Sequence, residues 1–372
     1  MSVRQPGVVV VGAGLAGAAA SWRLAASGFR VRVFEKADLV GGHARSEWFR
    51  GVPYEPNGAH IFHTHDAEVW KVVSGLVEFV PYRHRVLVRI GERLLTWPLQ
   101  VAELEALPEW DTIRLELGHR PTEPDPANFE TYCRSLLGQT LYERCVRDYT
   151  RKQWGRDPDA LAAATAFGRI ELRKDGLPDY FRDPHQGWPR GGYGALAEAL
   201  LADAEVHLGH PVTRANLSTV ADPGEPVVIT SALDDFYDGS DGELEWRGVR
   251  LEAQFMPGVL LEQQAMVVNE PSAGVPWTRT IETKWALPEL HEQPGTIVMR
   301  EFPGADAKHY PVLDQLGTNR AIQRRYEERL ASEQRGPMYA AGRLATYRYI
   351  NMDVAIRDGL SVADRIIREH GR

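Results

Sequence analysis

Short runs of consecutive apolar residues, typical of strands buried on both faces of a parallel sheet, recur along the chain. They occupy Val8 to Val11, Val31 to Phe34, Pro226 to Thr230 and Met338 to Ala341. Small and apolar residues after the first run predict a helix that ends near Gly28. The pattern therefore predicts a parallel sheet with helices on its faces, assembled from segments that are far apart in the sequence.

A second pattern, in which apolar and polar residues alternate, predicts an antiparallel sheet with one solvated face. It is present in Leu244 to Phe255, Ala265 to Asn269, Trp277 to Thr283 and Thr296 to Phe302. Two earlier segments, Arg85 to Ile90 and Arg93 to Trp97, predict a hairpin around the Gly91-Glu92 turn.

Helices are expected over Ala67 to Phe79 and over Asp353 to Glu369. A third helix, capped by Asn128, is expected to carry both cysteines of the chain, Cys133 and Cys145. Within one helix, a separation of 12 residues places these cysteines about 18 Å apart, too far for a disulfide. Because cysteine spacing typical of metal sites is also absent from the sequence, a reducing compartment and no bound metal are expected.

The composition is that of an ordinary globular protein. The 372 residues are 43% hydrophobic and 25% charged, and the net charge is −8. Without a sustained run of Lys and Arg, binding to nucleic acid or to an anionic membrane surface is disfavoured. No apolar run reaches the roughly 18 residues that a membrane span needs, so we expect a soluble, cytoplasmic protein with no membrane partner.

Candidate chemistry begins after the first predicted strand, at the turn Gly12-x-Gly14-x-x-Gly17. The first glycine makes a tight turn, the second lets the backbone approach a pyrophosphate, and the third lets helix and strand pack closely. Glu35 ends the second strand, where a carboxylate can accept hydrogen bonds from a ribose. This order of elements predicts a dinucleotide-binding unit for NAD or FAD. The pair Gly41-Gly42 resembles the FAD-binding branch of such proteins and favours FAD.

The segment Gly58-Ala59-His60-Ile61-Phe62-His63-Thr64 resembles the G-[PA]-H-I-F-H-T block of the prokaryotic UDP-galactopyranose mutases. Further blocks match this family in order and spacing, namely Tyr149 to Gly155, Gly191 to Tyr193, Val275 to Arg279 and Gly342 to Ala345, followed by Tyr347 and Tyr349. Members of the family are flavoenzymes that interconvert the six- and five-membered ring forms of UDP-galactose. The resemblance therefore implies an isomerase.

The resemblance also implies the architecture, an α/β fold with a discontinuous Rossmann-like FAD-binding domain, a small helical domain and an antiparallel β-sheet domain. The expected boundaries are residues 1–80, 194–243 and 313–372 for the FAD-binding domain, 98–148 for the helical domain, and 81–97, 149–193 and 244–312 for the sheet and substrate domain.

Two arginines, Arg169 and Arg279, match the family's diphosphate-binding pair, and the planar fork of arginine suits phosphate oxygens. With His63, which resembles a family histidine near the flavin, they are the expected catalytic residues. Implied substrate-binding residues are Tyr149, Trp154, Tyr180, Arg247, Asn269, Tyr310 and Tyr349. Expected cofactor-binding residues are Gly12, Gly14, Gly17, Glu35, Gly42, Arg343, Asn351 and Met352.

The reaction that the resemblance implies is redox-neutral. N5 of reduced FAD attacks the anomeric carbon and displaces the nucleoside diphosphate, after which the sugar ring opens and closes again through its 4-hydroxyl. Implied partners are a nucleotide-diphosphate sugar, a cellular reductant such as NAD(P)H and a second copy in a homodimer. The family also implies a mobile loop, here residues 156–173, and a place in cell-wall or natural-product glycan biosynthesis.

Departures from the family blocks leave the substrate open. Asn351 and Asp353 replace the usual Asp and His, Trp277 replaces Tyr, and His43 replaces Asn. Another base or a deoxysugar is therefore an alternative to UDP-galactose. An amine-oxidase-like FAD oxidoreductase and a flavin-binding protein without turnover are further alternatives. The arginine pair argues against the oxidoreductase, because an amine or hydride donor does not need two diphosphate contacts.

Overall fold

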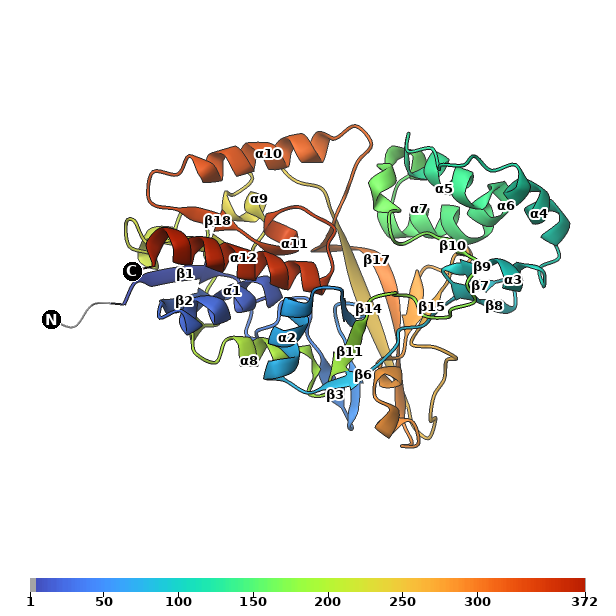
Figure 1. The fold of residues 1–372 in the computed structure, drawn as a ribbon, viewed down its shortest axis with the longest axis horizontal. Coiled ribbons are helices and arrows are strands. Elements are labelled where there is room, and N and C mark those ends of the chain that lie inside the picture. The colour runs from blue at the N-terminus through green and yellow to red at the C-terminus, as the bar shows by residue number, and fades with distance from the viewer. Residues whose placement is uncertain (1–4, 372) are drawn as a thin grey trace.

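A five-stranded parallel sheet, with strand order β12-β2-β1-β13-β18, organises one half of the molecule (Figure 1). The structure is a computed structural model that describes residues 5–371. The strands are β1 (Gly7–Val11), β2 (Arg30–Phe34), β12 (Glu205–His207), β13 (Val227–Ile229) and β18 (Met338–Ala340). The four apolar runs are thus confirmed as neighbouring strands, while β12 has no such run and was not predicted.

Helices cover both faces of this sheet. Val8 and Val10 of β1 pack with α1 (Leu15–Ala26), α8 (Gly192–Leu200) and α12 (Met352–His370). The alternate residues of β1, Val9 and Val11, pack on the other side with α9 (Leu233–Phe236) and α10 (Thr318–Ala331). A strand that is buried on both faces has apolar residues at consecutive positions. The helices on both faces of the sheet therefore explain the uninterrupted apolar runs in its strands.

A six-stranded sheet forms the second part of the fold, with the order β14-β17-β16-β15-β7-β8. Its strands are β7 (Val86–Ile90), β8 (Arg93–Trp97), β14 (Trp246–Met256), β15 (Val267–Asn269), β16 (Arg279–Ile281) and β17 (Thr296–Pro311). The predicted hairpin is confirmed as β7 and β8. The four alternating segments are confirmed as the antiparallel neighbours β14, β17, β16 and β15, whereas the parallel pairing of β15 with the hairpin strand β7 was not predicted. Alternation of residue types specifies the faces of a strand and not the direction of its neighbour.

The segment that follows β8 in the sequence is helical and differs most from the prediction. It contains α3 (Val101–Leu104), α4 (Trp110–Gly118), α5 (Phe129–Leu137), α6 (Gln139–Tyr142), a π-helical turn (Glu143–Arg147) and α7 (Asp148–Trp154). Asn128 caps α5, as expected. The single helix expected to carry both cysteines is wrong, because Gly138 has a φ of 82° and separates Cys133 in α5 from Cys145 in the π-helical turn. Both cysteines are buried and without a disulfide.

A small sheet, β5-β11-β6, connects the two larger ones and corrects one helix boundary. Its strands are β5 (Phe62–Thr64), β6 (Phe79–Pro81) and β11 (His185–Pro189). The helix expected to reach Phe79 is α2 (Ala67–Leu76). It ends earlier because Val77 is extended and Phe79 pairs with Pro189.

Further short elements are β3 (Glu47–Phe49), β4 (Val52–Tyr54), β9 (Leu99–Gln100), β10 (Leu172–Arg173) and α11 (Gly342–Ala345). Between residues 5 and 371 no helix is both long and apolar enough to cross a membrane.

The crossing of α1 and α12 depends on Gly359. A Cβ at this position would lie 2.1 Å from the carbonyl oxygen of Ala16 in α1. We therefore expect Gly359→Ala to destabilise the fold by about 1–3 kcal/mol, since two backbones must separate. Urea unfolding measures this change. The matched control is Gly75→Ala in exposed α2, where no atom lies within 4 Å of the added Cβ. The control should gain up to about 1 kcal/mol from helix propensity, and equal effects of the two changes would contradict the packing argument.

Candidate active site

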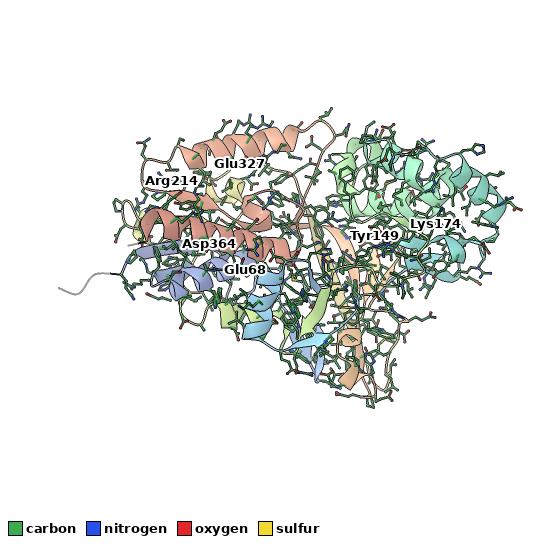
Figure 2. All side chains as sticks on the ribbon, in the orientation of Figure 1. Glu68, Tyr149, Lys174, Arg214, Glu327 and Asp364 are labelled. Carbon is green, nitrogen blue, oxygen red and sulfur yellow. The ribbon has the colours of Figure 1, made fainter. Side chains whose placement is uncertain are left out.

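A cavity of about 370 Å³ lies between the six-stranded sheet, α7 and the residues that precede α12. Tyr149 marks its position where the helical segment meets the strands (Figure 2). The expected catalytic, substrate and cofactor residues that line it are His63, Tyr149, Trp154, Arg169, Tyr180, Asn269, Arg279, Tyr310, Arg343, Tyr349, Asn351 and Met352. Residues from four distant parts of the sequence therefore meet in one space.

Two rows of residues across the six-stranded sheet form one wall of the cavity. In the first row, Arg279 of β16 lies beside Asn269 of β15, which lies beside Val88 of β7. In the second row, Val86 lies between Val267 and Trp97. Because adjacent strands are about 4.8 Å apart, the charged position at Arg279 lies about 10 Å from the apolar position at Val88. The wall thus changes from charged to apolar over a short distance.

Arg279 is fixed by a buried carboxylate. Its guanidinium lies 2.9 Å from Oε2 of Glu301, whose side chain has no exposed surface, and 3.5 Å from the hydroxyl of Tyr310. Thr278 Oγ1 donates to the other carboxylate oxygen of Glu301 at 3.0 Å. Burial lowers the pKa of Arg279, but Glu301 opposes burial and the net pKa is raised well above its ordinary value. Arg279 is therefore a permanent cation at the cavity wall.

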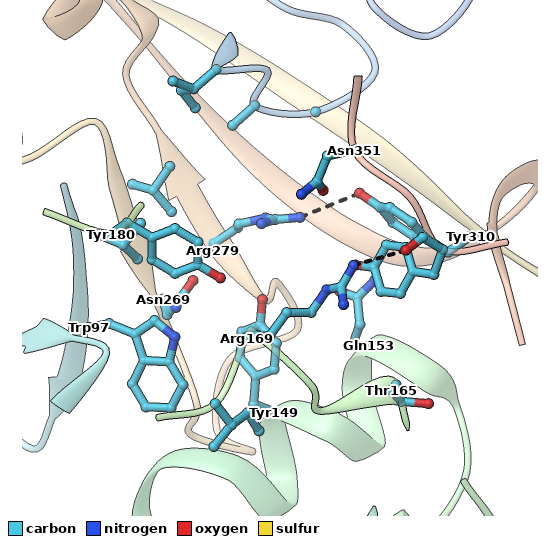
Figure 3. A pocket seen from close by; sticks show the side chains of 18 of the residues that line it. Trp97, Tyr149, Gln153, Thr165, Arg169, Tyr180, Asn269, Arg279, Tyr310 and Asn351 are labelled. Atoms are coloured by element: carbon cyan, nitrogen blue, oxygen red, sulfur yellow. Dashed lines mark hydrogen bonds between the residues drawn. The ribbon is translucent and has the colours of Figure 1, made fainter. Parts of the chain in front are cut away.

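Arg169 approaches the same space from the segment after α7 (Figure 3). Its guanidinium carbon lies 3.7 Å from the ring centroid of Tyr349, and Nη2 donates to the Tyr349 carbonyl at 3.3 Å. In Figure 3, Tyr180 and Asn269 lie on one side of the two arginines, and Tyr310 and Asn351 lie on the other. Two guanidiniums flanked by tyrosine hydroxyls are suited to a ligand with two phosphate groups.

His63 is held in one orientation by two neighbours. Its Nδ1 lies 2.9 Å from Oδ2 of Asp183, and its ring stacks on Phe181 with the centroids 3.5 Å apart. Burial lowers the pKa of His63, and the Asp183 carboxylate opposes this shift. A neutral imidazole that donates from Nδ1 to a carboxylate presents Nε2 as an acceptor. The contact with Asp183, far away in the sequence, was not predicted.

Arg247 was expected to bind substrate, but its guanidinium is used elsewhere. It is not one of the residues that line the cavity. Its Nε donates to the Gln153 carbonyl at 2.8 Å, and Nη2 donates to the Lys152 carbonyl at 3.0 Å. These contacts satisfy the last carbonyls of α7, a common use of arginine at helix ends. Arg247 therefore holds the helix that carries Tyr149 and Trp154.

Several cavity residues were missed by sequence reasoning. His84 is buried, its Nδ1 has no hydrogen-bond partner among the described residues, and burial lowers its pKa to about 3. His43 and His309 line the cavity with their rings stacked 4.4 Å apart. Trp97 also lines it, at the end of β8. For His84 and Trp97 no local pattern separates a cavity position from an ordinary core position, whereas His43 stood out as a departure from the family block.

The glycine turn fits a dinucleotide. Gly12 has a φ of 104°, and a Cβ at Gly17 would lie 2.1 Å from the Gly12 carbonyl oxygen. The start of α1 has no side-chain cap, so its first amides remain available to a phosphate. Glu35 accepts hydrogen bonds from the amides of Ala13 and Ala37, and each carboxylate oxygen keeps capacity for another donor.

Some buried polar atoms beside the cavity and the glycine turn have no hydrogen-bond partner among the described residues. They include the ring nitrogens His60 Nδ1 and His309 Nε2, whose residues line the cavity, and Ser231 Oγ, whose backbone lies beside Gly12. Buried polar groups are normally paired, so a polar ligand in this space would satisfy these atoms. Together with the close approach of Gly42 to Gly14, 3.1 Å from an added Cβ to Cα, the residues present fit a flavin dinucleotide.

These features define an α/β, Rossmann-like, nucleotide-dependent enzyme. Residues 144–349 match the family model described as UDP-galactopyranose mutase, and residues 10–76 match the NAD(P)-binding Rossmann-like domain. The chain therefore belongs to the UDP-galactopyranose mutase family. The family expected from the sequence, the Rossmann-like fold class and the isomerase class are confirmed.

Relatives match over nearly the whole chain. The dTDP-fucopyranose mutase of Escherichia coli is 29% identical, over 98% of this chain and 99% of the relative. The UDP-galactopyranose mutase of Mycoplasma pneumoniae is 27% identical, over 97% of this chain and 96% of the relative. The crystal structure of a reduced UDP-galactopyranose mutase has the same fold, with a TM-score of 0.79 and 16% identity, covering 99% of this chain and 97% of that one. The family makes this chain a flavin-dependent mutase of sugar nucleotides.

The contact between His63 and Asp183 gives a prediction for histidine titration. Because the Asp183 carboxylate raises the pKa of His63 against the effect of burial, Asp183→Asn should lower that pKa further. Protonation of His63 would then begin only at more acidic pH, and NMR of labelled imidazole would detect the change. His65 also contacts Asp183, at 3.1 Å, so His65→Gln is the control and should shift the His63 pKa less. An unchanged or raised His63 pKa in Asp183→Asn would contradict this assignment.

Proposed function

We propose that the chain interconverts the pyranose and furanose forms of a nucleotide-diphosphate sugar, with UDP-galactopyranose and UDP-galactofuranose as the first substrate pair. The observation that carries the proposal is the convergence of Arg169 and Arg279 on one cavity that Arg343 and Asn351, two of the expected cofactor-binding residues, also line. A diphosphate brings two negative charges, and this cavity supplies two guanidiniums within one space. FAD in its reduced state is the proposed cofactor, with NAD(P)H as a source of electrons.

Bound reduced FAD would supply the nucleophile, N5, that displaces the nucleoside diphosphate from the anomeric carbon. The protein's part is to hold and stabilise. Arg279 is kept charged by Glu301, so it offers a fixed positive charge to the departing diphosphate. Arg169 adds a second charge from the segment that follows α7 (Figure 3). His63, held by Asp183, offers a hydrogen-bond acceptor for a sugar hydroxyl or a flavin N–H.

The nucleotide base is proposed to occupy the apolar end of the cavity. There Tyr149 offers an aromatic face, and Val88, Val267 and Trp97 form the wall. Asn269 lies between this end and Arg279. Its side-chain amide can both donate and accept a hydrogen bond, as the hydrogen-bonding edge of a pyrimidine base requires. A few polar groups on an apolar surface are typical of sites that select one base.

A second substrate, a TDP-linked 6-deoxyhexose, is favoured by a specific observation. The relative named dTDP-fucopyranose mutase is 29% identical over 98% of this chain, which is as similar as the relatives named UDP-galactopyranose mutase, at 27 to 30%. The chemistry at the anomeric carbon would be unchanged. Compared with UDP-galactose, a dTDP-linked 6-deoxyhexose has an added methyl group on the base and lacks the 2′-hydroxyl of the ribose and the 6-hydroxyl of the hexose.

Incubation of chemically reduced protein with UDP-galactofuranose and, separately, with TDP-fucofuranose tests the function. We expect conversion to the pyranose form of at least one substrate, followed by chromatography, with no consumption of reductant in proportion to the sugar. Loss of activity after oxidation of the flavin is also expected. Consumption of one reductant per sugar would contradict a redox-neutral mutase, and no conversion of any nucleotide-linked hexose would contradict the proposal as a whole.

Arg169→Ala should lower kcat/KM by about 100-fold or more, because it removes one of two charges that stabilise the leaving diphosphate. Flavin absorbance should remain, since Arg169 contacts Tyr349 and the Phe167 carbonyl rather than the glycine turn. Arg182→Ala is the control, because Arg182 is exposed and paired with Asp175 outside the cavity. Steady-state kinetics compare the two. Near-normal activity of Arg169→Ala would contradict a role for Arg169 in the reaction. Arg279 is less suited to this test, because its loss leaves Glu301 buried without a partner.

A further inference from the structure

The ammonium of Lys152 is enclosed by four backbone carbonyl oxygens of one loop. Its Nζ lies 2.5 Å from the carbonyl oxygen of Glu270, 2.9 Å from that of Ser272, 3.2 Å from that of Val275 and 2.8 Å from that of Trp277. An ammonium has three N–H donors, so it is fully used by this set of acceptors. Neither catalysis nor flavin binding, as described above, uses Lys152.

The loop has few other connections. Its base is closed by the hydrogen bond from the Glu270 amide to the Thr278 carbonyl at 2.8 Å, and Arg89 pairs with the Glu270 carboxylate at 2.8 Å. Within residues 271–276, the other hydrogen bonds of the described chain are local ones to Ser272. The tip of the loop is therefore tied to the rest of the protein, as far as hydrogen bonds are concerned, by Lys152.

Lys152 and the loop each adjoin residues that line the cavity. Lys152 lies on α7 between Tyr149 and Trp154, both of which line the cavity. The loop joins β15, which ends at Asn269, to β16, which begins at Arg279. The ends of the loop are thus the residues proposed to meet the base and the diphosphate. Arg247 fixes the carboxyl end of the same helix to β14, so α7 is held from two sides.

We propose that Lys152 is a positioning residue for the nucleotide: its ammonium ties residues 270–277 to α7 and thereby sets the spacing between Tyr149 and the strands that carry Asn269 and Arg279. The inference rests on the proposed function, because it takes the nucleotide to lie between Tyr149 and these strands. Four carbonyl dipoles directed at one point repel one another unless a cation lies between them, so the loop keeps this form only while Lys152 is charged.

The charge on Lys152 is compatible with this role near neutral pH. Burial lowers its pKa to about 8, while the nearby carboxylates of Glu270 and Asp148 act in the opposite direction. Asp148 is itself paired with Arg147 and Arg151, and Glu270 with Arg89. At pH 7 the side chain is therefore an ammonium with all three donors.

Lys152→Met keeps an unbranched side chain, one heavy atom shorter than lysine, and removes the charge. We expect UDP, or TDP if that is the better ligand, to bind roughly tenfold more weakly or worse in isothermal titration calorimetry, as loss of a charge-assisted contact predicts. Amide hydrogen exchange should accelerate in residues 271–277 of the ligand-free protein. In the reduced enzyme KM should rise more than kcat falls. The control is Lys71→Met on exposed α2, which should change none of these.

A second variant separates loss of the charge from general damage. Lys152→Ala removes three methylenes and the ammonium, and propylammonium supplies the same atoms. Propylammonium at millimolar concentration should restore nucleotide affinity and slow the exchange of the loop, whereas 1-propanol, of similar size and uncharged, should not. Flavin absorbance and Tm of both variants report whether the remainder of the fold is intact.

The outcomes distinguish this inference from the function on which it rests. Unchanged loop exchange and unchanged nucleotide affinity in Lys152→Met would overturn the role of Lys152 while leaving the proposed mutase in place. Equal rescue by 1-propanol would overturn the requirement for charge. If the unsubstituted protein bound neither UDP nor TDP, the proposed function would fail first, and with it the positioning of a nucleotide.

Discussion

The pairing of Arg279 with Glu301 is the constraint from which the cavity is built. Glu301 has no exposed surface, and a buried carboxylate is costly unless a cation and hydrogen bonds compensate it. Arg279 provides the cation, and Thr278 provides a hydrogen bond. The guanidinium is thereby fixed at the edge of the cavity with its charge assured. In a protein of net charge −8, Arg169 and Arg343 beside this neutral pair make the cavity locally cationic.

The spacing of the strands in the six-stranded sheet sets the distances from the Arg279 guanidinium to the other residues of the cavity wall. Since Arg279, Asn269 and Val88 lie side by side on successive strands, the cavity wall passes from charged through amide to apolar in two strand spacings, about 10 Å. This change in polarity depends on the parallel pairing of β15 with β7. The pairing places the β7–β8 hairpin beside strands that lie some 180 residues further along the sequence. A nucleoside diphosphate changes in the same order, from charged phosphates to a largely apolar base. The strands alone therefore provide a wall whose polarity matches the proposed ligand.

Sequence reasoning predicted the parts of this structure that depend on local order. The strand, the Gly12 turn, the helix and Glu35 follow one another directly, and each has its own physical requirement, so the pattern is informative without tertiary contacts. The blocks around His63, Tyr149 and Arg279 placed most cavity residues through resemblance. Features that depend on tertiary contacts were not accessible. β12 has no apolar run, the π-helical turn at Cys145 follows from packing, and the partner of His63 is Asp183, 120 positions away.

The roles of arginine and lysine side chains are especially hard to predict from sequence. Residue type alone does not tell whether such a cation binds a ligand or the protein's own backbone. Lys152 lies in the family block Tyr149 to Gly155 and Arg247 was expected to bind substrate, yet their donors are taken by carbonyls of the 270–277 loop and of α7. Arg279 is fixed by a carboxylate, whereas Arg169 rests on the face of Tyr349 and on two carbonyls at 3.3 Å. Contacts of that kind are weaker than a buried ion pair, so Arg169 can change position at lower cost than Arg279. In the proposed reaction the diphosphate leaves the anomeric carbon and returns to it, so Arg279 would offer this group a fixed charge and Arg169 a charge that can shift with it.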